Sequence, residues 1–284
     1  MEEKKKRSKL PLAVIAGALV IAIAGGALKG ASVAARKNAL NTMAGLTEER
    51  VELIENFFTE GKKTLTLYAE APEIKALLED PDNDKAVVEA QEFTEYYSEH
   101  IDDLEGIYAS ELSTHVLTHT NKQVVGMITR ADTNNQKKLM EAMLDSEDGL
   151  YNCGIIMSPA SGRNIVSMYK IIPGDDDGYI GFAGLGLIAD SLLSNDIPSM
   201  KGIKSASYKI INVNNRKYIF GGDSDAAGND ITNDSLLSLC SELSGTDAPA
   251  KGNIEYKDEN GSYIAAYSYM PECGTLVMLE GKSR

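Results

Sequence analysis

The sequence predicts an α+β protein: an N-terminal transmembrane helix runs into a long helix, and two tandem units follow, each built on an antiparallel sheet. Three observations predict this. An uncharged apolar run covers residues 10–28. Apolar side chains then recur at helical spacing from about residue 31 to 78. Beyond residue 104 the apolar period changes to two, with turn residues between the runs.

The apolar run from Leu10 to Leu28 is long enough to cross a bilayer. As a helix, its 19 residues would span about 28 Å. The basic tail, residues 1–9, predicts a cytoplasmic N-terminus and an outer position for everything after the span. A cleaved signal peptide is the alternative, but its apolar region is usually shorter. We therefore expect residues 10–29 to anchor a single-pass protein of the cell membrane, with an extracytoplasmic main body.

Two helices are predicted before the first sheet, within residues 30–103. The first covers about residues 31–78, and Pro72 marks a break or a new first turn in it. The second covers about residues 85–100. The apolar stripe of the long helix exceeds what two small units would cover, so we expect a homodimer through this helix.

Two units of similar order are predicted after these helices, in residues 104–200 and 201–284. The first unit has expected strands at 107–112, 115–120, 150–158, 164–172 and 179–187, with helices at 134–144 and 188–196. The second unit has expected strands at 206–213, 217–220, 252–256, 262–269 and 275–279, with a helix at 233–243. Strands in antiparallel order with a helix on one face are typical of α+β units.

Charge and composition restrict the function. The chain has 42 acidic and 28 basic residues and a net charge of -14, which disfavours nucleic acid as a partner. Glycines between residues 178 and 186 do not form a dinucleotide fingerprint; they indicate a strand against which something packs closely. We expect no cofactor. No nucleophile–base set or carboxylate pair can be assembled, so no enzymatic activity is predicted.

A metal site is not predicted either. His115 and His119 are four residues apart, which on a strand is about 13 Å, too far for both imidazoles to share an ion. Cys240 and Cys273 could form a disulfide outside the cell, but the sequence does not fix the distance between them.

Three stretches resemble the Cache modules of bacterial methyl-accepting chemotaxis proteins. They are LEGIYASELSTHVLTHTNKQVVGMITR (104–130), GLYNCGIIMSPASGRNIVSMYK (149–170) and IEYKDENGSYIAAYSYMPECGTLVML (254–279). Their order resembles that of an extracytoplasmic double-Cache sensor over roughly residues 40–280. The resemblance implies two PAS-like units, with 104–200 distal and 201–284 proximal to the membrane. Such receptors continue into a second membrane helix and a signalling coiled coil, so we expect part of a longer receptor or an anchored binding protein.

The resemblance implies sensing of a small polar ligand outside the cell and transmembrane signal transduction. The alternatives are the sensor half of a histidine kinase or diguanylate cyclase, and an anchored binding or assembly protein that does not signal. The resemblance places the ligand in the distal unit, whose strands carry the candidate ligand-binding residues His119, Arg130, Tyr151, Asn152, Ser167, Tyr169 and Asp190.

Each type of candidate side chain has a chemical reason to be chosen. Arg130 would hold a carboxylate through paired hydrogen bonds. Tyr151 and Tyr169 offer flat apolar faces with a hydroxyl, and Asp190 could accept a hydrogen bond from an amine. The amino-acid-binding branch of the family carries an aromatic-rich motif with an arginine after its first strands. Here only Arg130 and scattered tyrosines could stand in for that motif, so the resemblance does not support an amino-acid ligand.

Overall fold

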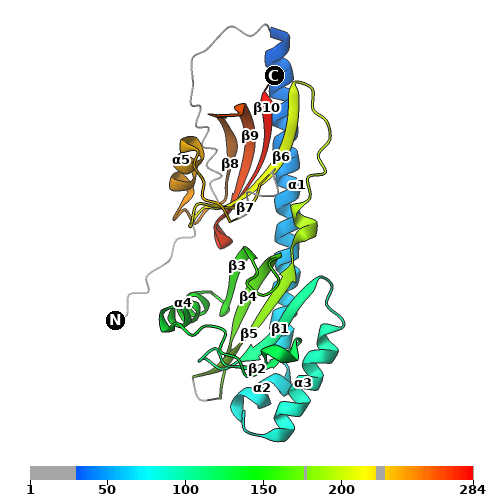
Figure 1. The fold of residues 1–284 in the computed structure, drawn as a ribbon, viewed down its shortest axis with the longest axis vertical. Coiled ribbons are helices and arrows are strands. Elements are labelled where there is room, and N and C mark those ends of the chain that lie inside the picture. The colour runs from blue at the N-terminus through cyan, green and yellow to red at the C-terminus, as the bar shows by residue number, and fades with distance from the viewer. Residues whose placement is uncertain (1–29, 176–177, 222–227, 284) are drawn as a thin grey trace, which may run out of the picture.

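The computed structural model describes residues 30–175, 178–221 and 228–283, and its architecture is α+β (Figure 1). The predicted tail and membrane helix, in residues 1–29, lie outside this part of the chain. Among the helices described, none combines the length and the hydrophobicity that crossing a bilayer requires.

Five α-helices and two five-stranded sheets make up the described structure. The helices are α1 (Gly30–Ala69), α2 (Pro72–Glu79), α3 (Asp84–Ser98), α4 (Thr133–Leu144) and α5 (Asp234–Leu243). Short 3-10 turns are η1 (Lys122–Val124), η2 (Asp190–Leu193) and η3 (Pro271–Cys273). The first sheet contains β1 (Leu104–Ser110), β2 (Val116–His119), β3 (Leu150–Met157), β4 (Asn164–Pro173) and β5 (Tyr179–Ile188). The second contains β6 (Ile203–Asn212), β7 (Lys217–Phe220), β8 (Ala250–Asp258), β9 (Gly261–Met270) and β10 (Thr275–Ser283).

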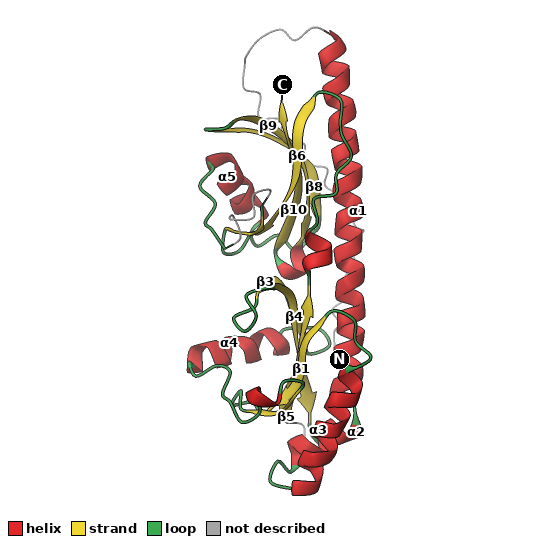
Figure 2. Ribbon diagram, turned by 45° about the vertical axis from the view of Figure 1, so that its right-hand side comes forward, coloured by secondary structure: helices red, strands yellow, loops and turns green. Residues whose placement is uncertain are grey.

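The two sheets share one topology. The first has the strand order β2-β1-β5-β4-β3 and the second β7-β6-β10-β9-β8, with antiparallel neighbours throughout. The two predicted antiparallel units are thus confirmed. Helix α1 runs along both sheets: the second sheet lies beside its N-terminal part and the first beside its C-terminal part (Figure 2).

Polar and proline signals set the helix boundaries. The predicted helix over 31–78 is two helices, because α1 ends at Ala69 and Pro72 opens α2. Proline suits the first turn of a helix, where its missing N–H would have no intrahelical partner. Side chains of Asn83, Asp132 and Asn233 accept backbone N–H bonds at the starts of α3, α4 and α5.

One predicted helix is wrong in extent. The helix expected over residues 188–196 is only the 3-10 turn η2, and the chain is extended from Ser194 onward. Arg50 of α1 donates to the Leu192 carbonyl at 2.5 Å, and the Asn195 side chain accepts from the Tyr208 N–H at 3.0 Å, so contacts with distant residues hold this segment in place of further helical bonds.

Each sheet is covered on both faces. On one face α1 buries Ile54, Leu65 and Tyr68 in a core shared with both sheets. On the other face, α4 packs on the first sheet and α5 on the second. Cys240 and Cys273 are free thiols in separate core clusters, so the structure contains no disulfide between them.

Candidate ligand-binding site

A cavity of about 560 Å³ lies on the α4 side of the first sheet. Strands β1, β4 and β5 form its floor, while the segment after β2 and the β3–β4 hairpin form its walls. Four of the predicted residues line it together: His119, Arg130, Ser167 and Tyr169. The volume and the mixed apolar and polar lining suit a small organic molecule.

Arg130 and Tyr169 form the polar end of the cavity. The Arg130 guanidinium donates a hydrogen bond to the Tyr169 hydroxyl at 2.8 Å and lies 4.8 Å above the Tyr169 ring centre. Ser167 donates to the same hydroxyl at 3.1 Å. A guanidinium has five N–H donors, so these contacts take only part of its capacity.

The backbone of Arg130 is fixed to its surroundings. Its N–H donates to the Thr114 hydroxyl at 3.1 Å, and its carbonyl accepts from Thr114 at 3.1 Å and from Gln136 at 2.6 Å. Gln136 belongs to α4 and Thr114 precedes β2. The cation is therefore held between two elements before any ligand arrives, which reduces the entropy lost on binding.

Tyr108 and His119 stack along one wall, with ring centres 5.4 Å apart. The Asn121 N–H donates to Nδ1 of His119 at 2.7 Å, so the neutral imidazole carries its proton on Nε2. Burial lowers the pKa of His119, although the charge of Glu105 opposes this shift. Burial raises the pKa of Tyr108, so its hydroxyl stays neutral.

The glycine-rich strand β5 makes room for these rings, as its sequence predicts. A Cβ on Gly184 would lie 2.4 Å from the Tyr108 ring, and one on Gly186 would lie 3.0 Å from the Glu105 carboxylate. Two glycines on the central strand thus create the floor of the cavity.

Glu105 brings a carboxylate to the same cavity. It accepts a hydrogen bond from Ser161, in the hairpin between β3 and β4. The cavity therefore contains an anionic group as well as the cation of Arg130.

Three predicted residues lie outside the cavity. Tyr151 is paired with Tyr169 in the sheet and packs with Cys153 beside α4; burial raises the pKa of Tyr151 to about 12. Asn152 is buried against the second unit, with its amide 3.5 Å from Glu272. Asp190 is exposed and forms an ion pair with Arg163 at 2.6 Å.

Sequence reasoning missed Tyr108 and Glu105. The predicted first strand begins at residue 107, whereas β1 begins at Leu104, so the prediction leaves Glu105 outside the strand. Glycine at positions 184 and 186 was the available signal for a large neighbour, but the sequence does not show which side chain fills the space. His115, the second histidine of the pair considered for a metal site, lies outside the cavity and contacts Glu111 at 3.0 Å.

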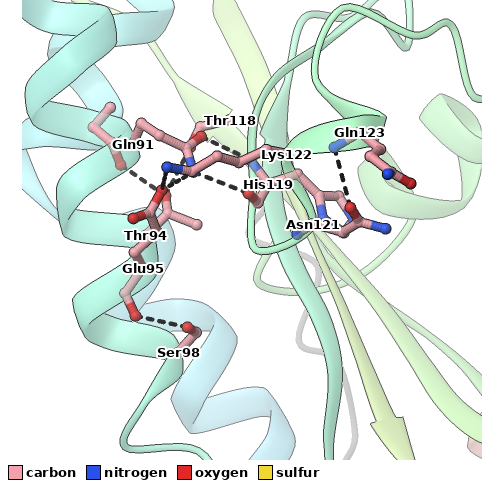
Figure 3. A network of polar contacts seen from close by, with 10 residues as sticks. Gln91, Thr94, Glu95, Ser98, Thr118, His119, Asn121, Lys122 and Gln123 are labelled. Carbon is pink, nitrogen blue, oxygen red and sulfur yellow. Dashed lines mark hydrogen bonds and ion pairs between the residues drawn. The ribbon is translucent and has the colours of Figure 1, made fainter.

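A buried polar network joins the cavity wall to the helices behind it (Figure 3). Gln91 of α3 donates to the His119 carbonyl at 3.1 Å and accepts from Thr118 at 2.8 Å. Thr118 also lies 3.0 Å from the Thr94 hydroxyl, which is 2.8 Å from the hydroxyl of Tyr68 on α1. Strand β2 is thereby connected to α1 through α3.

No protein-family model matches the sequence, and no curated protein is similar enough to count as a relative. Solved structures do match. The sensory domain of the Campylobacter jejuni chemoreceptor Tlp3 with isoleucine bound is 14% identical with a TM-score of 0.60, over 91% of this chain and 98% of that one.

Two further matches are a sensor domain and a ligand-binding domain. The V. cholerae histidine kinase DctB sensor domain is 9% identical with a TM-score of 0.60, over 87% of this chain and 99% of that one. The ligand-binding domain of Mlp24 with asparagine is 12% identical with a TM-score of 0.55, over 90% of this chain and 96% of that one. With its two five-stranded sheets on one long helix, this chain has the fold of a double-Cache sensory domain.

Proposed function

We propose that this chain is the extracytoplasmic sensory region of a membrane receptor, and that the cavity of the first unit binds its ligand. The observation that carries the proposal is the pairing of Arg130 with Tyr169 inside a 560 Å³ cavity. A fixed cation with unused donors in a half-apolar pocket suits the carboxylate of a small molecule. The same fold occurs in chemoreceptor and histidine kinase sensors, so we do not assign the output.

The opposite charges in the cavity suggest the class of ligand. Arg130 would take a carboxylate, while Glu105 would accept from an ammonium group. The Ile165 side chain, next to Gly186, adds an apolar surface to the lining. An α-amino acid with a small side chain fits this arrangement. The Tlp3 domain has isoleucine bound and the Mlp24 domain has asparagine, which supports the same class here.

Signalling would use the helix that both units share. Closure of the first unit on its ligand would shift β2 against α3 and α1, and such interface shifts are about 1–2 Å in known switches. The ligand can drive the shift only by its difference in affinity for the two states. A transmembrane helix at residues 10–29 would continue α1 and carry the displacement to the cytoplasm.

We also propose a homodimer through α1. Leu53 and Leu67 of this helix are 50% and 56% exposed. They are fourteen residues apart, so they lie on one side of the helix. Sedimentation of the full chain in detergent tests this: Leu53→Ser with Leu67→Ser should convert a dimer to a monomer, and an unchanged mass would contradict it.

Calorimetric titration of the full chain in detergent against the twenty L-amino acids tests ligand binding. Arg130→Gln should weaken binding of any amino acid that binds by about 10- to 100-fold, since bonds to a charged group contribute about 1.5–3 kcal/mol. Arg163→Gln is the matched control, because Arg163 pairs with Asp190 outside the cavity.

Equal losses in both arginine variants would contradict the site. Absence of binding across the whole panel by a folded chain would contradict the amino-acid class. A second panel of small monocarboxylates and dicarboxylates then decides whether the Arg130 site accepts any carboxylate.

A further inference from the structure

The second sheet holds a buried ion pair on the face that corresponds to the cavity of the first. Lys209 on β6 and Glu280 on β10 are 3.0 Å apart, with side chains only 17% and 7% exposed. Both lie on the α5 side of the sheet, as the cavity lies on the α4 side of the first sheet. Because the strand orders are the same, β6 corresponds to β1 and β10 to the glycine-rich β5.

Three tyrosine rings surround the Lys209 ammonium. Its nitrogen is 5.6 Å from the ring centres of Tyr218 and Tyr256 and 5.9 Å from that of Tyr263. These distances are within the range of cation–π attraction. The Tyr256 hydroxyl lies 3.2 Å from the ammonium and donates to Glu280.

The cluster has the parts of a binding site for an organic cation. Aromatic faces recognise ammonium groups, and a buried carboxylate supplies the counter-charge. Removing one partner of such a pair leaves a buried charge without compensation, so the remaining carboxylate would favour another cation.

We propose that the second unit contains an ammonium-binding site whose occupant is the chain's own Lys209. In the first unit the ligand comes from solution, whereas in the second unit the Lys209 side chain itself occupies the site. Once the lysine side chain is removed, the same cage takes a small primary alkylammonium ion.

Chemical rescue of Lys209→Ala tests the proposal. The substitution removes a fragment equivalent to propylammonium, so the full chain in detergent should unfold at a lower temperature. Propylammonium chloride should then raise that temperature in a saturable manner, well beyond sodium chloride at the same ionic strength. Wild type and Lys209→Met, whose side chain still fills the space, should respond to both salts equally.

An equal response of Lys209→Ala to the two salts, or the same propylammonium effect on wild type, would overturn the proposal. A second measurement covers the case in which Lys209→Ala does not fold. Glu280→Gln should lower the folding equilibrium constant at least tenfold more in wild type than in Lys209→Met. The same loss in both backgrounds would also overturn it.

Discussion

The two sheets have one topology but differ on the face turned away from α1. In the first, the central strand β5 carries Gly184 and Gly186 there, and a cavity stands above them. In the second, the central strand β10 carries Met278 and Glu280 on the corresponding face, and Lys209 fills the space. One scaffold thus offers either a face with a cavity or a filled face, and the side chains of the central strand and of the strand beside it decide which.

The largest effect is expected from removing the buried Lys209–Glu280 ion pair of the second sheet. Glu280→Gln leaves Lys209 without its carboxylate in a site that is nearly closed to water, and should cost about 3 kcal/mol or more in the free energy of unfolding. Glu255→Gln is the matched control on the same sheet, since the Glu255 side chain is 54% exposed in its pair with Arg36. That substitution should cost less than about 1 kcal/mol.

Urea unfolding of the full chain measures both costs. Similar losses in the two variants would mean that the Lys209–Glu280 pair behaves as a surface pair. The second unit would then not be filled by a buried ion pair, and the contrast between the sheets would fail.

The next effect concerns the face with the cavity. Gly184→Val places a branched side chain into the Tyr108 ring, which a Cβ alone would approach to 2.4 Å. The ring must move into the cavity, at a cost of about 1–3 kcal/mol for overpacking. Amino-acid binding should fall at least tenfold, as measured by calorimetry.

Gly45→Ala is the opposite case within α1. A Cβ at Gly45 meets nothing within 4 Å, so alanine should stabilise the helix by about 0.5–1 kcal/mol and leave binding unchanged. Full amino-acid binding by Gly184→Val, equal to that of the Gly45→Ala control, would mean that the Tyr108 ring does not shape the cavity.

The sequence is sufficient for most of the fold, because the folding signals are local. The period of apolar residues, Pro72 and the capping side chains of Asn83 and Asn233 act within a few residues of each boundary. The failure at residues 188–196 comes from distant contacts. Leu192 and Leu193 are buried as a helical pattern predicts, but Arg50 of α1 binds the Leu192 carbonyl and the Tyr208 N–H binds the Asn195 side chain.

The candidate site is less accessible to sequence reasoning, because it depends on register. Asn152 and Tyr151 are on the correct strand, but Asn152 pairs with Met168 on the face turned away from the cavity, and its amide lies near Glu272 of the second unit. Asp190 follows the correct strand, but pairs with Arg163 in solvent. Strand register and bulges depend on neighbours far along the chain, and no local pattern contains them.

A smaller effect should distinguish the hydrogen bond that connects α1 to the first unit from the one that connects it to the second. Tyr68 reaches the first unit through Thr94 and the network behind β2, whereas Tyr208 of β6 donates to the Leu46 carbonyl of α1 at 3.0 Å. Tyr68→Phe and Tyr208→Phe each lose one hydroxyl contact, at a cost of about 1 kcal/mol. Only Tyr68→Phe should also weaken amino-acid binding, by about two- to fivefold. Equal amino-acid binding by the two variants would mean that the polar network behind β2 does not influence the site.

The smallest effect is a pH dependence carried by the wall of the cavity. Burial lowers the pKa of His119 in the folded chain, so the unfolded chain takes up a proton first as the pH falls through about 6.5. The contribution of His119 to stability is complete above that pH and is lost as the pH falls toward the folded-state pKa. Urea unfolding at about pH 7.5 and 5.5 should show a larger loss for wild type than for His119→Gln. The exposed His100, replaced by Gln, controls for removal of an imidazole as such. Parallel losses in wild type and His119→Gln would mean that the ring is hydrated in both states, and that the wall it forms with Tyr108 is open to water even without a ligand.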